Sequence, residues 1–399
     1  MNITPNLSEL LSNFDLGLFL TQNKHLKAEK FLLDSKDNTK ELNTLLAQQL
    51  LVYPKADNKL PTFTKHNCWF TSKSFEQASS EETAFFKASL FSGGQMLDLS
   101  GGLGVDDWAF SNQFKNVISL DPDSFLNELV RENFKKLGVK NIIRIDSIAE
   151  NYLEKTVEVY DLIYLDADRR TEKGKAFFLD QGKPNYLAIK NLCAKVSSKV
   201  LLKLSPMIDL TYLKITLPNL TKIWVLGDKS EVKEILAYID FSKPTELETE
   251  LVIINNLGKS IHFKDKSIEP ISPKISNLNY FFEPHSCLIK GNLYKEYAAT
   301  FSLQLLSAQS LYFTSKHLPN NFMGRAFETI QIIDFSKAKV KDYIEKYGIK
   351  NANISKKNFP IEVDEIKKIF KLKDGGEEYL FFSTNEKGLK VMFHCKKIP

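Results

Sequence analysis

Cysteines and long apolar runs are both scarce in this sequence. Its 399 residues include four cysteines, and no two of them form a CxxC pair. This spacing argues against a disulfide framework and against a zinc site, so we expect no bound metal. No apolar run approaches the ~20 residues of a membrane helix, and residues 1–20 lack the basic start of a secretory signal. We therefore expect a cytoplasmic protein without a membrane partner.

Internal repeats and low-complexity tracts are also lacking. Hydrophobic residues make up 43% of the chain and charged residues 26%, which is ordinary for a folded globular protein. A length of 399 residues predicts about two or three domains. The charge is uneven, because residues 272–399 carry a net +7 and the remainder −2. This asymmetry favours a polyanionic partner on the basic side, although lysine-rich surfaces are commonly only solvated.

Apolar periodicity divides the chain into three stretches. Residues 1–50 have helical spacing that we expect to end at Pro54, and a polar connector at 55–75 precedes a helix at 76–90. Strands and helices then alternate, which predicts a doubly wound, parallel α/β sheet. After Pro270, shorter elements predict a small α+β region. The expected strands of the middle stretch are 96–100, 116–121, 141–146, 159–166, 199–205, 220–227 and 250–256, and the expected helices are 106–114, 124–138, 184–198 and 230–239.

A glycine-rich segment lies between the first expected strand and a helix. It reads Asp98-Leu-Ser100-Gly101-Gly102-Leu-Gly104. Glycines let the backbone turn tightly and approach a ligand, and the helix N-terminus beyond them commonly holds pyrophosphate. A carboxylate at Asp98 would repel pyrophosphate but suits an ammonium group. This favours the methionine part of S-adenosylmethionine over NAD.

Acidic residues also end the next expected strands. Asp121 can accept hydrogen bonds from ribose hydroxyls, and Asp146 with Ser147 can accept from an adenine amino group. Asp166 ends the fourth strand. Because ligands bind at the carboxyl ends of parallel strands in open sheets, these positions together predict an S-adenosylmethionine site. A glycine loop that only closes a strand turn, and an NAD site, are the alternatives.

At these residues the chain resembles the class I, Rossmann-like S-adenosylmethionine-dependent methyltransferases. More narrowly, it resembles bacterial methyltransferases that carry a C-terminal THUMP-like domain, over nearly the whole chain. The segments that carry the resemblance are EQASSEETAFFKA (76–88), LDLSGGLGVDD (97–107), YLDADRR (164–170), KLSPMIDL (203–210), EPHSCLIKGNLY (283–294), LYFTS (311–315), GRAFE (324–328) and KNFP (357–360).

We expect an N-terminal helical segment at 1–74 and a methyltransferase domain at 75–258. The resemblance implies a ferredoxin-like piece at 277–321 and a THUMP-like domain at 322–399. THUMP domains proper are modules of RNA-modifying enzymes, so the resemblance implies a tRNA or rRNA substrate. One motif departs from the family, which has Asp-Pro-Ala-Arg-Arg where this chain has Asp166-Ala-Asp168-Arg-Arg. The added carboxylate bears on the chemistry of the acceptor more than on the cofactor.

Each candidate near the fourth strand has a structural alternative. Asp166 is the catalytic candidate, in contact with the acceptor atom, and its alternative is a loop cap. Arg169 and Arg170 can clamp substrate phosphates or neutralise a neighbouring acid. Lys203 borders the same pocket or is only a rim charge.

Other candidates lie outside the strand ends. Gln77 and Ser80 can bond the methionine carboxylate, or Ser80 can cap a helix. Arg325 is a candidate RNA contact. A basic face with aromatic side chains would suit unpaired RNA, and ordinary packing is the alternative. The expected members of that face besides Arg325 are Lys316, Lys356, Lys357, Phe313 and Phe359.

The sequence therefore predicts an S-adenosylmethionine-dependent methyltransferase that acts on RNA held by its C-terminal modules. Two alternatives stay open. One is a methyltransferase for a protein or a small molecule, and the other is a non-catalytic relative that binds S-adenosylmethionine or RNA. The altered stretch at 166–168 keeps the second alternative in play.

Overall fold

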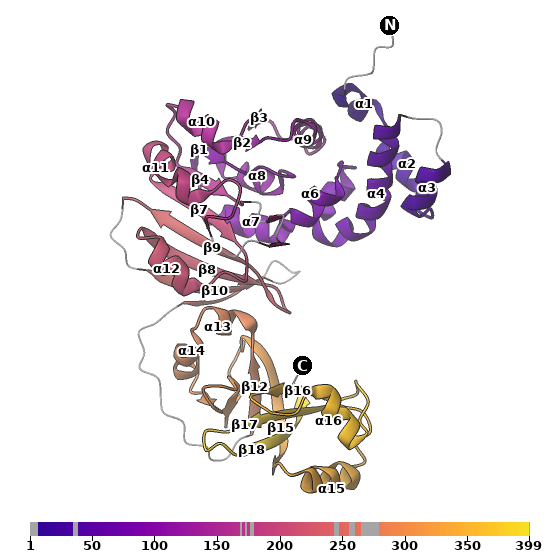
Figure 1. Ribbon diagram of the computed structural model, residues 1–399, viewed down its shortest axis with the longest axis vertical. Helices are drawn as coiled ribbons and strands as arrows, with labels where there is room; N and C mark the ends of the chain where they lie inside the picture. The colour runs from indigo at the N-terminus through magenta and orange to yellow at the C-terminus, as the bar shows by residue number, and fades with distance from the viewer. Residues whose placement is uncertain are drawn as a thin grey trace. The chain divides into compact units, whose positions relative to one another are not determined.

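The chain forms two compact units, Met1–Ile223 with Glu234–Leu247 and Trp224–Lys233 with Glu248–Pro399. Within the ranges described below, no helix combines the length and the hydropathy of a membrane span. The computed structural model, shown as a ribbon in Figure 1, describes residues 7–34, 39–167, 170–171, 174–175, 179–242, 247–254, 260–264 and 279–398.

Six helices lead into the first unit within the described residues. Helix α4 packs against α2, α3, α5 and α6. It does not end at Pro54 as expected but continues to Lys59. Proline removes one backbone donor, and burial of Val52 and Ala56 on either side holds the helix together. The expected connector at 55–75 is thus largely helical. The bounds are α1 (Leu7–Asn13), α2 (Leu16–Asn23), α3 (Ala28–Asp34), α4 (Lys40–Lys59), α5 (Pro61–Lys65) and α6 (Ser72–Gln77).

The sheet of the first unit has the strand order β9-β7-β4-β1-β2-β3. The neighbours from β7 to β3 are parallel, as expected. Helices α8 and α9 pack on β2, and α10 packs on α11. The bounds are α7 (Glu81–Ser89), β1 (Gly93–Asp98), α8 (Val105–Phe110), β2 (Phe114–Asp121), α9 (Ser124–Lys136), β3 (Ile142–Asp146), α10 (Ala149–Lys155), β4 (Leu162–Leu165), β5 (Arg170–Thr171), β6 (Gly174–Lys175), α11 (Tyr186–Val196), β7 (Lys199–Leu204), α12 (Leu210–Thr216) and β9 (Val232–Asp240).

One expected helix is a strand. Residues 230–239 have helical spacing, yet β9 forms there and runs antiparallel to β7. Residues 234–237 are buried in succession. A strand covered on both faces loses the alternation of apolar and polar residues, so its apolar positions can coincide with those of a helix.

The second unit contains a curved sheet of order β13-β14-β12-β15-β18-β17-β16, and β11, β10 and β8 follow one another in the order β11-β10-β8. The bounds are β8 (Leu220–Gly227), β10 (Glu248–Ile254), β11 (Ser260–Lys264), β12 (Tyr280–Pro284), α13 (Ser286–Lys290), α14 (Tyr294–Thr300), β13 (Gln304–Leu305), β14 (Phe313–Ser315), β15 (Gly324–Asp334), α15 (Lys337–Tyr347), β16 (Asn353–Lys357), α16 (Val363–Phe370), β17 (Glu378–Thr384) and β18 (Lys390–Lys397).

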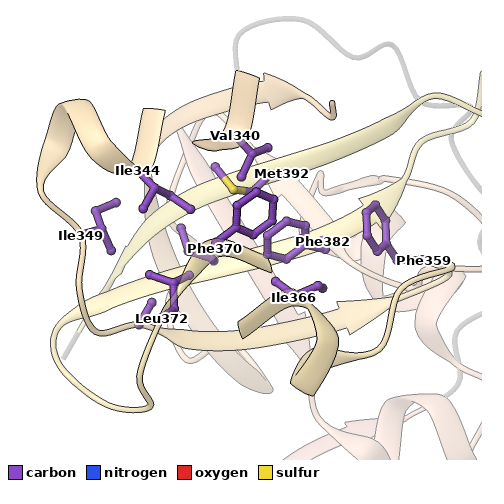
Figure 2. Close-up of a cluster of buried hydrophobic side chains, with 11 residues drawn as sticks. Val340, Ile344, Ile349, Phe359, Ile366, Phe370, Leu372, Phe382 and Met392 are labelled. Carbon is purple, nitrogen blue, oxygen red and sulfur yellow. The ribbon is translucent and has the colours of Figure 1, made fainter. Parts of the chain in front are cut away.

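Alternate residues of β17 and β18 enter two separate apolar clusters. Phe382 and Met392 pack under α15 and α16, as Figure 2 shows. Phe381 and Phe393 point to the other face, where they meet Phe281. Because successive strand residues point to opposite faces, this sheet carries an apolar core on each side.

Candidate functional site

The structure brings the four acidic strand ends to one edge of the sheet. Asp98, Asp121 and Asp146 are the last residues of β1, β2 and β3, and Asp166 directly follows β4. The strands are parallel neighbours. The Asp166 backbone N–H donates to Ser100 Oγ at 2.6 Å, and Ser147 N donates to the carbonyl of Asp121 at 3.3 Å. The ends of β1 to β4 are therefore linked to one another along the sheet edge at which ligands bind in open α/β sheets.

The glycine loop follows β1 and is held against β2. Gly102 N donates to Asp121 Oδ2 at 3.0 Å. A Cβ at Gly101 would lie 2.1 Å from Arg144 Nη1, so no larger residue fits without displacing that side chain. Gly104 has a φ of +77°, and a Cβ there would lie 2.6 Å from the Phe134 ring. Two of the glycines are thus required by close packing, apart from any ligand.

Asp98 is almost fully buried, with 1% of its surface exposed. Its Oδ1 accepts from Ser100 N at 2.7 Å and from Ser100 Oγ at 3.0 Å. Burial and the facing carboxyl of Asp107 raise the pKa of Asp98 well above its ordinary value. The first role of Asp98 in this structure is therefore to hold the loop, while contact with a cofactor stays a prediction.

Arg144 of β3 joins the elements beneath the loop. Its Nη1 donates to Asp107 Oδ2 at 3.1 Å and to Ser119 Oγ at 2.9 Å. Its Nη2 donates to the carbonyl of Gly102 at 2.6 Å, and its Nε to Asn127 Oδ1 at 2.5 Å. Arg144 was not predicted from the sequence, although an arginine inside the apolar strand NIIRID is itself a sign of a buried partner.

A second buried network lies under β4. The Lys87 side chain has no exposed surface, and its Nζ lies 2.9 Å from Asp106 Oδ1 and 3.2 Å from Glu234 Oε1. Tyr164 donates its hydroxyl to Asp106 at 2.9 Å. Burial alone would raise the pKa of Asp106, but the ammonium groups of Lys87 and Lys203 hold it below its ordinary value. This network was also not predicted, because its members lie far apart in the sequence.

Asp166 forms an ion pair with Lys203 of β7. Burial opposes the charged form of Lys203, but Asp166 and Glu234 raise its pKa above the ordinary value. Lys203 therefore stays protonated and balances Asp166. The added carboxylate Asp168 and the candidate Arg169 lie outside the described residues, as does the side chain of the candidate Arg170.

The helices before β1 border the same region. Ser80 caps α7 and accepts from Thr83 N at 3.3 Å, which is the structural alternative considered for it, and Gln77 is half-buried at the end of α6. Lys59 of α4 donates to the carbonyl of Phe75 at 2.7 Å. Burial and the charge of Lys203 lower the pKa of Lys59 to about 8. The N-terminal helices thus place a second cation near Lys203.

Two exposed apolar side chains follow the acids of β2 and β3. Phe125 is 41% exposed and Ile148 is 44% exposed. Each lies only a few residues beyond Asp121 or Asp146 in the chain. These two side chains were not predicted as site residues, because their exposure is visible only in the fold. Among the described residues, no group of His, Cys, Asp and Glu converges on a metal position.

The expected basic and aromatic face of the second unit is present only in part. Phe313 and Phe359 are buried, with 0% and 6% exposed, so they are packing residues and do not offer rings for stacking. Lys356 is paired with Glu362. Arg325 is half-exposed and paired with Glu283 on the neighbouring strand.

Comparison with known proteins agrees with this architecture. A family described as THUMP domain-like matches residues 324–397. A protein from Porphyromonas gingivalis W83, provisionally described as a methyltransferase, is 27% identical with a TM-score of 0.83, over 96% of this chain and 98% of that one. No curated protein sequence matches. The resemblance is thus confirmed: a class I, Rossmann-like methyltransferase fold with a THUMP-like C-terminal region.

More distant solved structures share only part of the fold. M. capricolum TrmK, in complex with S-adenosyl-homocysteine, is 13% identical with a TM-score of 0.33, over 43% of this chain and 71% of that one. An rRNA methylase from Streptococcus thermophilus is 13% identical with a TM-score of 0.29, over 40% of this chain and 93% of that one. Likeness at this level adds nothing to the assignment of the site.

Proposed function

We propose that the protein is an S-adenosylmethionine-dependent methyltransferase that acts on RNA. The observation that carries the proposal is the single sheet edge where the glycine loop, Asp121, Asp146 and Asp166 meet. The full-length likeness to a protein described as a methyltransferase supports the reaction class. The THUMP-like match and the net +7 of residues 272–399 support an RNA substrate.

The residues at this edge fit the parts of S-adenosylmethionine. Asp121 presents a carboxylate to ribose hydroxyls. The side chain of Asp146 is 41% exposed and pairs with Arg131 through Oδ1, so its other carboxylate oxygen would accept from the adenine amino group. Phe125 and Ile148 offer apolar surfaces beside them for the adenine ring. A Cβ at Gly102 would meet nothing closer than 3.7 Å, so backbone lies open at the loop. Ser100, Gln77 and Ser80 border the position of the methionine part.

When bound, the cofactor supplies a methyl group that its sulfonium has already activated. The protein therefore mainly positions the acceptor atom in line with the methyl group. Asp166 lies at the strand end next to the loop, where it can hold an acceptor N–H or O–H and take up its proton. Lys203 forms an ion pair with Asp166 and holds that side chain at the strand end.

Nucleoside mass spectrometry tests this function. The tRNA and rRNA of a strain that lacks the gene are compared with those of its parent, and complementation uses the wild-type, Asp121→Ala and Asp166→Ala genes. The proposal predicts that one methylated nucleoside disappears and that only the wild-type gene restores it. Unchanged RNA in the deletion strain would move the assignment to a protein or small-molecule substrate, or to a non-catalytic binder.

A further inference from the structure

The sheet of the second unit curls until its distant strands approach each other. Strands β14 and β16 lie far apart in the strand order. Nevertheless, the hydroxyl of Tyr312, one residue before β14, lies 3.1 Å from Ser355 Oγ in β16. The apolar cluster around Phe281 and Phe381 fills the inside of this curl.

Polar side chains collect at one end of the curl. Glu283 and Arg325 are register partners on β12 and β15, and Arg325 Nε donates to Glu283 Oε2 at 2.6 Å. Ser355 Oγ donates to Glu283 Oε1 at 3.5 Å. Lys357 Nζ lies 4.7 Å from the centroid of the Tyr312 ring. The cluster of Glu283, Arg325, Lys357, Tyr312 and Ser355 is called the mouth cluster below.

The mouth cluster has one more positive than negative group. Arg325 and Lys357 are cationic, and Glu283 is the carboxylate that faces them. Glu283 is already engaged by Arg325, and among the described residues no hydrogen bond or ion pair involves the Lys357 ammonium. Burial lowers the pKa of Lys357, which shows that its charge is poorly solvated there. An anion at this point would gain the donors of the Lys357 ammonium, which lies over the Tyr312 ring.

We propose that the mouth cluster binds one phosphate group of a nucleic acid backbone. Lys357 supplies an ammonium held in place over an aromatic ring, and Arg325 supplies a guanidinium that can turn from Glu283 to a phosphate. Glu283 holds Arg325 in place in the absence of ligand and competes with the phosphate for it. The inference rests on the proposed RNA substrate, and it names where the second unit contacts that RNA.

The test is the salt dependence of tRNA binding by the full chain, measured by fluorescence anisotropy. Lys357→Gln should weaken binding and reduce the slope of log K against log salt by about 1, as loss of one phosphate contact requires. The matched control is Lys341→Gln, which removes one charge from α15 of the same unit and should leave the slope nearly unchanged. An unchanged slope in Lys357→Gln, or no tRNA binding by the wild type, would overturn the proposal.

The variant Glu283→Gln tests whether the mouth cluster binds phosphate or only supports the fold of the second unit. If the carboxylate competes with phosphate, its removal should tighten tRNA binding by about threefold or more at low salt, where charge effects are largest. A purely structural cluster predicts weaker binding and a lower melting temperature instead. Titration with S-adenosylhomocysteine in parallel reports on the cofactor site, so a failed phosphate site and a failed methyltransferase assignment give different results.

Discussion

The first unit buries charge, whereas the two sheet clusters of the second unit are apolar and aromatic. Lys87, Asp107 and Arg144 are nearly inaccessible in the first unit. The clusters around Phe281 and Phe382 consist of hydrophobic side chains. Buried charges cost free energy unless they are paired, and here they are paired directly beneath the sheet edge proposed to bind the cofactor. In the second unit, by contrast, basic side chains such as Arg325 are exposed and can meet a polyanion.

The largest expected effect comes from the buried arginine. Arg144→Met would leave Asp107 without its cation and remove the donors that hold Gly102 and Ser119. We expect a loss of about 3–5 kcal/mol in the free energy of unfolding, as for other broken buried pairs. Arg325→Met in the second unit is the matched control, because its side chain is 48% exposed, and it should cost about 0–1 kcal/mol. Urea denaturation measures the free energy of unfolding of both variants. Similar losses would contradict the contrast between buried charge in the first unit and exposed charge in the second.

Replacement of the glycines sharpens the role of Arg144. A Cβ at position 101 collides with the Arg144 guanidinium, whereas a Cβ at position 102 has open space. Gly101→Ala should therefore cost about 1–3 kcal/mol, as overpacking does. Gly102→Ala should cost about 1 kcal/mol, because its φ of +49° disfavours a side chain. Thermal unfolding of the two variants measures these losses of stability. Equal losses would show that Arg144 does not constrain the loop.

Asp98→Asn should raise the stability of the folded protein at pH 7. The folded protein holds the proton of Asp98 more tightly than the unfolded chain does. The free energy of unfolding therefore falls as the pH rises above 3.8, the ordinary pKa of this carboxyl. Asparagine keeps the acceptor for Ser100 without that penalty. We expect a melting temperature higher by about 2–4 °C for each kcal/mol gained at pH 7.

The pH dependence of Asp98→Asn is the check on its cause. The difference between variant and wild type should vanish near pH 4 and below, where both chains carry a neutral group. Phe381→Leu in the second unit provides a reference that should be destabilised equally at both pH values, since no titrating group is involved. A stabilisation of Asp98→Asn that does not change with pH would contradict the assigned protonation.

The smallest effect is expected from an exposed ion pair of the second unit. Lys341 and Glu345 lie 3.8 Å apart on α15, with side chains 63% and 65% exposed. Lys341→Ala should change the free energy of unfolding by less than about 0.5 kcal/mol. A larger loss in urea denaturation would show that surface charge supports the second unit as buried charge supports the first.

Much of the first unit could be predicted from local sequence, because each of the strands β1–β4 is a short apolar run that is followed directly by its acidic residue. It failed where burial is two-sided, as at β9, and where packing outweighs proline, as at Pro54. The buried partners of Lys87 and Arg144 come from distant elements. No local pattern contains that information. The acidic strand ends of the candidate site could therefore be predicted from the sequence, but the buried ion pairs beneath them could not.

In the second unit, too, contacts between distant parts of the chain could not be predicted from local sequence. Phe313 and Phe359 have the composition of a stacking surface, yet both are buried in the fold. Arg325 and Lys357 were selected from the sequence for their charge alone. Only the curl of the sheet reveals that they share one end of it with Tyr312 and Glu283.

Calorimetric titration of S-adenosylhomocysteine into the full chain tests the central claim, that the acidic sheet edge is a cofactor site. Wild type, Asp121→Ala and the control Lys341→Ala, which changes an exposed residue of the second unit, are compared at pH 7. The account predicts one-to-one binding by the wild type and the control, and at least about tenfold weaker binding by Asp121→Ala, a loss of about 1.4 kcal/mol or more. No binding by the folded wild type, or equal binding by Asp121→Ala, would contradict it.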